Sequence, residues 1–481
     1  MNKKKHCFVA AFVFFFVSVS PGAAEVPSQT EVVIIGAGLS GLSAAYQLKK
    51  AGVAYRILEA APRVGGRVRT VTYQIPGKPD IYVDSGMEEY WASNPAVRYL
   101  KELGLPVDHG PAASSLILEG KLYALADETS LEFQKKILTA DEFKALEKFK
   151  AKVTPWVRQL EKGKASAELL KFKEDSFADF VTKEKLPSKV AEWIRVSVEC
   201  ESGTEWDNIS ALDGLAEFHI FLGEGEEYYR VQGGNQKFTD ALAGVIGWEN
   251  ISLNKRVTSV VTKGTIVTVH YLDGQTNENG SVEASRVIST IPLFRLPQLQ
   301  FDPPLSEEKL AAIESLGWGA YFKAHIFVKP GAKKFWTVNG QSILPVLSDS
   351  KLGVIYDGNP QDEEPKILSL LIQGKYAETF GLPIFPADRA RQEIKETFEE
   401  LWPGFSKEIE RIEFYNYHPR AIAAWPPGRS RFDQKSEAIR KPENRVYLAG
   451  DFTESSHSDG AFISAERAVR QILEERKKTE R

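Results

Sequence analysis

Cysteine and histidine are scarce in this sequence. Its 481 residues include two cysteines, Cys7 and Cys200, and seven histidines. Cys7 falls in an N-terminal segment that we interpret below as a signal peptide, so the mature chain would keep one cysteine and form no intramolecular disulfide. The hydrophobic core must then supply the stability of the fold. With one cysteine and no ligand spacing among the histidines, the sequence gives no indication of a metal site.

Long apolar segments are absent after the first residues. Lys3, Lys4 and Lys5 precede an apolar stretch at residues 8–19, and small residues follow at 22–24. This order is typical of a secretory signal peptide (residues 1–24), and the apolar stretch is too short to span a bilayer comfortably. We therefore expect an exported protein, periplasmic or secreted, with no stable membrane span after cleavage. An uncleaved membrane anchor is the alternative.

The rest of the chain also lacks a basic block. The formal net charge is −4, and removal of the signal peptide would take away three lysines and no acid, which gives −7 for the mature chain. This charge argues against a nucleic-acid partner. The composition, 43% hydrophobic and 26% charged, is ordinary for a globular protein, and the length suggests two or three domains.

The segment at residues 31–59 predicts a dinucleotide site. A β-branched run at 31–35 is typical of a buried parallel strand, and a helical stretch at 42–50 and a second strand at 54–58 follow it. Between the first strand and the helix lies a G-x-G-x-x-G motif: Gly36, Ala37, Gly38, Leu39, Ser40 and Gly41. These glycines allow a tight turn, the close approach of a pyrophosphate and close helix packing, and the helix N-terminus offers N–H groups to the phosphates. Glu59 is placed to accept hydrogen bonds from a ribose. A plain glycine turn is the alternative.

The residues after Glu59 indicate which dinucleotide is bound. They include Ala60, Arg63 and the run Gly65-Gly66-Arg67. Here the sequence resembles the flavin-dependent amine oxidase family, which includes monoamine and polyamine oxidases. The resemblance implies FAD, with the two glycines close to the flavin and its phosphates. The family often has a basic residue two positions after the acid; Ala61 stands there in this chain, and Arg63 is the candidate to take over its role.

Later segments carry the same resemblance. A strand at 81–86 ends on Gly86, which the family places against the flavin, and Met87 stands where a second glycine is common. A strand at 445–451 and a helix that opens at 460 resemble the C-terminal flavin motif of the family, with Asp in place of the more usual Glu at 451. The resemblance thus adds these residues to the predicted FAD site: Gly86, Met87, Val257, Gly450, Asp451, Ala461 and Phe462.

The order of the motifs predicts a discontinuous fold. We expect an α/β architecture with a Rossmann-like FAD-binding domain and an α+β substrate domain, similar to glutathione-reductase-like flavoproteins. The FAD-binding domain would comprise residues 25–98, 229–300 and 415–481, and the substrate domain residues 99–228 and 301–414. Amphipathic patterns at 140–153 and 167–180 predict helices in the substrate domain. The oligomeric state, including a homodimer, stays open.

Lys323 is the candidate catalytic residue. In the stretch at 317–328, alternation with period 2 places Phe322 and Ala324 on one face of a strand and Lys323 and His325 on the other. A mid-strand lysine with bulky neighbours is costly to bury unless it has a partner or a role. Its position matches the family lysine that holds a water near flavin N5. The alternative is an edge-strand lysine in solvent.

Three residues are candidates for contact with the substrate. Glu88 follows Gly86 and would attract a cationic amine. The family often has an aromatic pair over the flavin. His457 falls at one of these positions, where tyrosine is frequent, and the other position falls on Trp425 or, in a second alignment, on Ala421. Ordinary packing of Trp425 and a satisfied loop histidine at position 457 are the alternatives.

The resemblance implies an FAD-dependent oxidase of primary or secondary amines, polyamines included. A hydride would pass from the carbon bearing nitrogen to flavin N5, the imine would hydrolyse to an aldehyde, and O₂ would be reduced to H₂O₂. FAD should be bound non-covalently, because the thioether link of monoamine oxidases needs a cysteine in the C-terminal third and none follows Cys200. A link through a histidine is the alternative. An FAD-dependent desaturase or porphyrinogen-type oxidase, an L-amino acid oxidase and a non-catalytic secreted flavoprotein are the alternatives.

Overall fold

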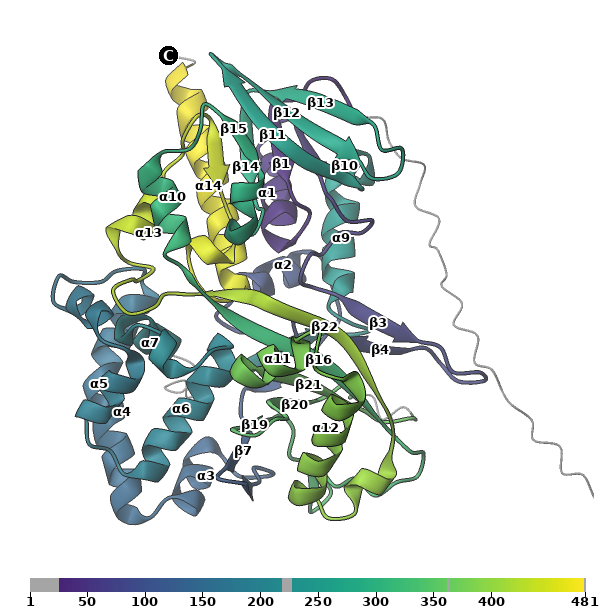
Figure 1. The fold of residues 1–481 in the computed structure, drawn as a ribbon, viewed down its shortest axis with the longest axis vertical. Helices are drawn as coiled ribbons and strands as arrows, with labels where there is room; N and C mark the ends of the chain where they lie inside the picture. The colour runs from purple at the N-terminus through teal and green to yellow at the C-terminus, as the bar shows by residue number, and fades with distance from the viewer. Residues whose placement is uncertain (1–25, 219–226, 361–363, 480–481) are drawn as a thin grey trace, which may run out of the picture.

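The computed structural model describes residues 26–218, 227–360 and 364–479. They form two halves, each built on a central sheet, and a lobe of helices beside the second half (Figure 1). The expected signal peptide lies outside the described residues. Within the described ranges, no helix combines the length and the apolar character that a membrane crossing needs.

A five-stranded parallel sheet is the centre of the first half. Both faces of the sheet are buried, because successive side chains of strand β1 point to opposite faces. Val32 and Ile34 pack against helices, and Val33 and Ile35 pack against a second sheet. The helices are α1 (Leu39–Lys50), α2 (Ala96–Glu102), α9 (Gln236–Ile246) and α14 (Ser458–Thr479). In spatial order, the strands are β10 (Ile251–Ser252), β2 (Tyr55–Leu58), β1 (Val32–Ile35), β14 (Arg286–Ser289) and β23 (Val446–Leu448).

The second sheet of this half covers the other face of the parallel sheet. It has four strands in the order β13 (Asn279–Ala284), β12 (Ile266–Asp273), β11 (Lys255–Lys263) and β15 (Gln300–Asp302). Helices α10 (Glu307–Glu314) and α13 (Gln434–Arg440) pack against each other next to it (Figure 1). The strand–helix–strand order predicted for residues 31–59 is confirmed; helix α1 begins at Leu39, earlier than expected, because the second half of the glycine motif is already helical.

A seven-stranded mixed sheet forms the second half. Its long strands, β16 and β22, run across the middle of the molecule (Figure 1), and β22 continues past the domain boundary expected at residues 414–415. One face is covered by α11 (Gly374–Gly381) and α12 (Ala387–Leu401). In spatial order, the strands are β22 (Ile409–Ala424), β16 (Gly317–Val328), β21 (Ile367–Gln373), β20 (Val354–Asp357), β19 (Val346–Ser348), β7 (Ser115–Leu118) and β8 (Lys121–Tyr123).

The helical lobe comes from the first part of the expected substrate domain. It contains α3 (Ser130–Ile137), α4 (Ala140–Glu161), α5 (Phe177–Lys183), α6 (Ser188–Ser202) and α7 (Ala211–Glu217). The helix predicted at residues 140–153 is confirmed and extends to Glu161. The prediction of one helix at 167–180 is wrong: a 3₁₀ turn at Leu169–Glu174 ends before α5, because Ser176 is extended and its hydroxyl caps the new helix at Asp179.

Short strands connect the two halves. β3 (Thr70–Tyr73) and β4 (Ile81–Asp84) form a hairpin, and β5 (Tyr90–Trp91), β9 (Glu227–Val231) and β6 (Val107–Pro111) form a three-stranded sheet. The loop between β4 and β5 carries Gly86, Met87 and Glu88. It therefore lies where the two halves of the molecule meet.

Candidate active site

The glycine motif forms a turn that a side chain would block. Gly36 has φ +103°, and a Cβ at Gly41 would lie 1.9 Å from the carbonyl oxygen of Gly36. A Cβ at Gly38 would instead meet only the Cα of Gly66, at 4.0 Å. The backbone is therefore accessible to a ligand at Gly38, beside the N-terminus of α1, where no side chain caps the helix.

The second glycine pair lies against this turn. The N–H of Gly65 donates to the carbonyl of Ala37 at 2.8 Å, and Gly38 and Gly65 form an isolated parallel bridge. The guanidinium of Arg63 donates to the carbonyls of Val64 and Gly66 at 2.9 and 2.8 Å. Arg63 thus stabilises the double-glycine turn by donating to its backbone oxygens.

Glu59 joins the ends of the first two strands. Its carboxylate accepts hydrogen bonds from the N–H groups of Ala37 and Ala61, both at 2.7 Å. A carboxylate has about four acceptor positions, so two remain for the hydroxyls of a ribose. Its neighbour Ala60 is exposed, and Leu39 and Ser40 are buried at the start of α1.

Arg67 and Asp451 meet although they lie far apart in the sequence. Nη1 of Arg67 donates to Oδ2 of Asp451 at 2.7 Å and to the carbonyl of Ala421 at 2.6 Å. Asp451 follows β23 and is 4% exposed. The N–H of Gly450 donates to Ser464 on α14 at 2.8 Å. The basic loop and the C-terminal motif therefore form one wall.

The other predicted FAD residues lie around the same cradle. A Cβ at Gly86 would lie 2.0 Å from the carbonyl oxygen of Arg67, and the N–H of Met87 donates to that oxygen at 3.2 Å. Val257 is buried on β11 and shares a core cluster with Leu58. Ala461 and Phe462 open α14, but the ring of Phe462 packs in the core, so only its backbone is a candidate for contact with the cofactor.

Lys323 lies in the middle of β16 and is 3% exposed. Strands β21 and β22 flank β16 on both sides, so the alternative of an edge-strand lysine in solvent is excluded. The two faces separate as the alternation predicts: Phe322 and Ala324 belong to the core beneath α11 and α12. Lys323 Nζ forms a short ion pair with Oε1 of Glu88 on the other face.

Glu88 has further partners that the sequence did not reveal. Ser369 Oγ donates to its Oε1 at 2.8 Å, and Arg230 Nη2 donates to its Oε2 at 2.9 Å. Arg230 lies on β9, next to the Gly233-Gly234 segment, and Ser369 stands opposite His325 in the β16–β21 register. A buried lysine calls for a partner, but only the tertiary fold shows which acid supplies it.

Burial shifts the pKa values of three titratable groups near this ion pair. Burial, followed by the charge of Glu88, raises the pKa of Asp84 to about 7, and burial raises the pKa of Glu89 to about 7. His325 is fully buried, and desolvation together with the charge of Lys323 lowers its pKa well below the ordinary value. His325 is therefore neutral at pH 7, and its Nδ1 lies 2.8 Å from the hydroxyl of Tyr73.

His457 belongs to a second buried cluster of charges. Its Nε2 lies 2.6 Å from Oε2 of Glu217, at the end of α7. Arg431 forms ion pairs with both Glu217 and Asp213, one turn apart on that helix. Although desolvation opposes it, the charge of Glu217 raises the pKa of His457 to about 9, so the imidazole is cationic at pH 7.

Trp425 is 1% exposed and packs in the core cluster with Ala423, and its Nε1 donates to Ser436 at 3.2 Å. These contacts account for Trp425 as a packing residue. Ala421, the alternative of the second alignment, is the residue whose carbonyl accepts from Arg67.

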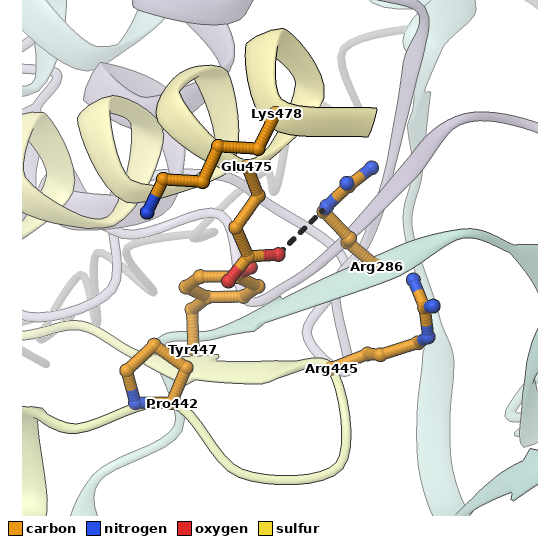
Figure 2. A pocket seen from close by; sticks show the side chains of 6 residues that line it. All are labelled: Arg286, Pro442, Arg445, Tyr447, Glu475 and Lys478. Carbon is orange, nitrogen blue, oxygen red and sulfur yellow. Dashed lines mark hydrogen bonds and ion pairs between the residues drawn. The ribbon is translucent and has the colours of Figure 1, made fainter. Parts of the chain in front are cut away.

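A cavity of about 360 Å³ lies at the opposite edge of the parallel sheet (Figure 2). It opens where β14 and β23 begin, whereas the glycine cradle lies where the parallel strands end. Glu475 accepts from Arg286 there at 3.4 Å. The residues that line this cavity are Arg286, Pro442, Arg445, Tyr447, Glu475 and Lys478.

No group of residues that could hold a metal ion is found in the part of the chain that the structure describes.

The cradle fits a dinucleotide, and the buried lysine stands beside it at the junction of the two halves. This arrangement defines a two-part flavoprotein oxidoreductase. The sequence model of the flavin containing amine oxidoreductases matches residues 39–473, and the chain belongs to this family. It is an FAD enzyme that oxidises amines, with a small-molecule amine and O₂ as its reactants.

Individual relatives are distant but match over nearly full length. A putative flavin-containing monoamine oxidase of Mycobacterium tuberculosis is 24% identical, over 93% of this chain and 97% of that protein. An L-amino acid oxidase of Bothrops pictus is 26% identical, over 98% and 96%.

Solved structures share the fold at lower identity. Cyclohexylamine oxidase from Brevibacterium oxydans has a TM-score of 0.74 and 21% identity, and covers 93% of this chain and 99% of its own. Putrescine oxidase, bound to putrescine, has a TM-score of 0.74 and 20% identity, with 92% and 99% coverage. The α/β flavoprotein fold expected from the sequence is confirmed.

Proposed function

We propose that the protein is an FAD-dependent oxidase of primary or secondary amines, polyamines included. The main support for this proposal is the position of Lys323, a buried lysine on β16 that contacts Glu88 in the loop after Gly86. Bound FAD supplies the acceptor for a hydride from the carbon next to nitrogen and the route by which O₂ becomes H₂O₂. The released imine hydrolyses to an aldehyde.

The chain itself positions the groups around this chemistry. Gly38 leaves the backbone open to the pyrophosphate, Glu59 offers acceptors to the ribose, and Asp451 pairs with Arg67 in the wall of the cradle. The Lys323 ammonium has three donors and its bond to Glu88 uses one, so it can hold a water in the site. The first turn of α14 provides N–H groups beside Asp451.

An L-amino acid oxidase is the second candidate, because several relatives at 25 to 26% identity carry that name. Such an enzyme needs a cation for the substrate carboxylate. Arg230 and Arg67 are arginines near Met87. Arg230 Nη2 donates to Glu88 and its Nη1 to the carbonyl of Asp357 at 2.9 Å, and the guanidinium of Arg67 is paired with Asp451. With these donors used internally, the site favours amines without a carboxylate.

A peroxide assay with a panel of substrates tests the proposal. The panel holds monoamines, diamines, polyamines and L-amino acids, and aldehyde or keto acid is measured in the same samples. We expect H₂O₂ and aldehyde in equal amounts from at least one amine. Activity with L-amino acids alone would establish the second candidate. If no substrate in the panel gives H₂O₂ although FAD is bound and photoreducible, the oxidase would be contradicted and a non-catalytic flavoprotein favoured.

We also propose that the protein is exported to the periplasm or secreted, on the basis of residues 1–24 alone. Expression of the full chain in a bacterial host, followed by N-terminal sequencing of the protein in the periplasm and medium, tests this. A mature N-terminus at Glu25 is the expected result. A full-length protein that stays with the membrane fraction would show an uncleaved anchor instead.

A further inference from the structure

A buried lysine and a half-buried arginine share one carboxylate at the junction of the halves. Glu88 Oε1 pairs with Lys323 and accepts from Ser369, and Oε2 accepts from Arg230 at 2.9 Å. Glu88 and Lys323 are 4% and 3% exposed. A buried charge is tolerated when it is paired and hydrogen-bonded. Both oxygens of Glu88 are therefore committed to the protein itself.

The backbone of Glu88 is held as firmly as its side chain. Nδ2 of Asn235, a fully buried residue at the start of α9, donates to the carbonyls of Met87 and Glu88 at 3.2 and 2.7 Å. The N–H of Asn235 in turn donates to Asp84 at 3.0 Å. These bonds fix the loop next to Gly86 independently of the side chains of the second half.

Other groups facing Lys323 do not replace Glu88. The ring of Tyr356 lies 5.8 Å from Nζ, and Ser369 is neutral. His325, two positions along β16, is neutral at pH 7 because burial lowers its pKa. Burial raises the pKa values of Glu89 and Asp84 to about 7, and the carboxylate of Asp84 accepts from Thr70 and Asn235 instead. Arg230 adds a second positive charge. Glu88 is thus the carboxylate in contact with the ammonium.

We propose that Glu88 is a positioning residue that fixes the Lys323 ammonium at the active site, rather than a binding group for the substrate. The inference depends on the role proposed for Lys323 above. Without Glu88, Lys323 and Arg230 would lose the carboxylate that bridges them, and the ammonium would turn away from its present direction. A displacement of about 1 Å in an active site can cost on the order of 100-fold in rate.

The test compares Glu88→Gln, Lys323→Met and the double variant, each saturated with FAD. Stopped-flow spectroscopy measures flavin reduction by amine without oxygen and flavin reoxidation by O₂ as separate steps. We expect Glu88→Gln to slow reoxidation about 10- to 100-fold, with reduction much less affected, and the double variant to be no slower than Lys323→Met. Asp433→Asn, which removes the acid of a separate buried pair with Arg429, is the matched control and should leave both steps unchanged.

Thermal unfolding of the same holoenzymes gives a readout that is independent of turnover. Glu88→Gln should lower the melting temperature, and adding Lys323→Met should restore part of the loss, because one uncompensated cation disappears. Additive losses would show that the two residues are not coupled and would overturn the inference. If Glu88→Gln does not fold, Glu88→Asp replaces it, with slowed reoxidation as the expected result and parental rates as the contradiction.

The outcomes separate this inference from the proposed function. A slow Lys323→Met enzyme with a parental Glu88→Gln enzyme would overturn the positioning role and leave the amine oxidase intact. Parental reoxidation in Lys323→Met would remove the role that Glu88 is proposed to serve, and both assignments would fail. A raised KM for amine in Glu88→Gln, with both flavin steps at parental rates when the amine is saturating, would show that Glu88 contacts the substrate.

Discussion

His457 and Glu217 form an ion pair across 240 positions of sequence, with Nε2 and Oε2 2.6 Å apart. Glu217 ends α7 in the helical lobe, whereas His457 directly precedes α14, the helix that follows the C-terminal flavin motif. Arg431 pairs with the other oxygen of Glu217, and Ser456 donates to that oxygen at 3.1 Å. The pair therefore ties the helical lobe to the segment beside the cofactor cradle.

This pair predicts a loss of stability at alkaline pH. The pKa of His457 is raised to about 9, whereas a histidine in the unfolded chain titrates near 6.5. The pair therefore contributes on the order of 3 kcal/mol to the free energy of unfolding. This contribution is complete below about pH 6.5 and disappears as the pH rises through about 9. Urea unfolding of the parent and of His457→Asn at pH 6 and pH 10 measures it. A destabilisation by the substitution that is equal at both pH values would contradict the pair.

FAD should leave the protein without cleavage of a covalent bond. The cysteine among the described residues, Cys200, is buried in α6 of the helical lobe, and burial raises the pKa of its thiol well above the ordinary range. A buried, protonated thiol is a poor nucleophile. Acid precipitation should release all flavin into the supernatant, where its absorbance is measured. Yellow colour that stays with the pellet would contradict non-covalent binding.

Glu59→Ala should weaken FAD binding without unfolding the parallel sheet. The substitution removes a ribose acceptor, and a hydrogen bond to a charged group contributes about 1.5–3 kcal/mol, so the Kd should rise on the order of 10- to 100-fold. Flavin retained after dialysis measures the change. Glu102→Ala, at the end of α2, is the control, because its carboxylate bonds Tyr46 and Lys50 away from the cradle. Equal flavin content in both variants would place the ribose elsewhere.

Lys323→Met should slow turnover while the flavin stays in place. Methionine keeps most of the length of the side chain and loses the charge and the donors. We expect reoxidation by O₂ to suffer more than anaerobic reduction by amine, since the ammonium holds the water of the site. Stopped-flow spectroscopy times the two steps. Rates that both match the parent would make Lys323 a structural residue.

The parallel sheet and its cradle could be predicted from sequence because each signal is local. The run from Val32 to Glu59 contains its own strands, glycine turn and helix, and the apolar alternation of β16 identifies the two faces around Lys323. Such local patterns agree with the structure, because the spacing of apolar residues along a helix or strand determines which face is buried.

The partners of these residues could not be predicted in the same way. Glu88 meets Lys323 and Arg230 only after three segments of the chain come together, and nothing near residue 457 indicates that Glu217 will bind it. The pattern at 167–180 does not show the break before α5 for another reason. The hydroxyl of Ser176 accepts from the N–H of Asp179 and so starts a new helix within a stretch of helical periodicity. Capping by one side chain overrides a periodicity read over many residues.

Anaerobic mixing of the FAD-loaded enzyme with amines tests the central claim most directly. The visible absorbance of the bound flavin is followed after mixing with each amine of the panel, and O₂ is then admitted. The account predicts bleaching by at least one amine at a rate that saturates with its concentration, and full recovery with one H₂O₂ formed per flavin. If no amine bleaches a flavin that dithionite reduces readily, the proposed amine oxidase is contradicted.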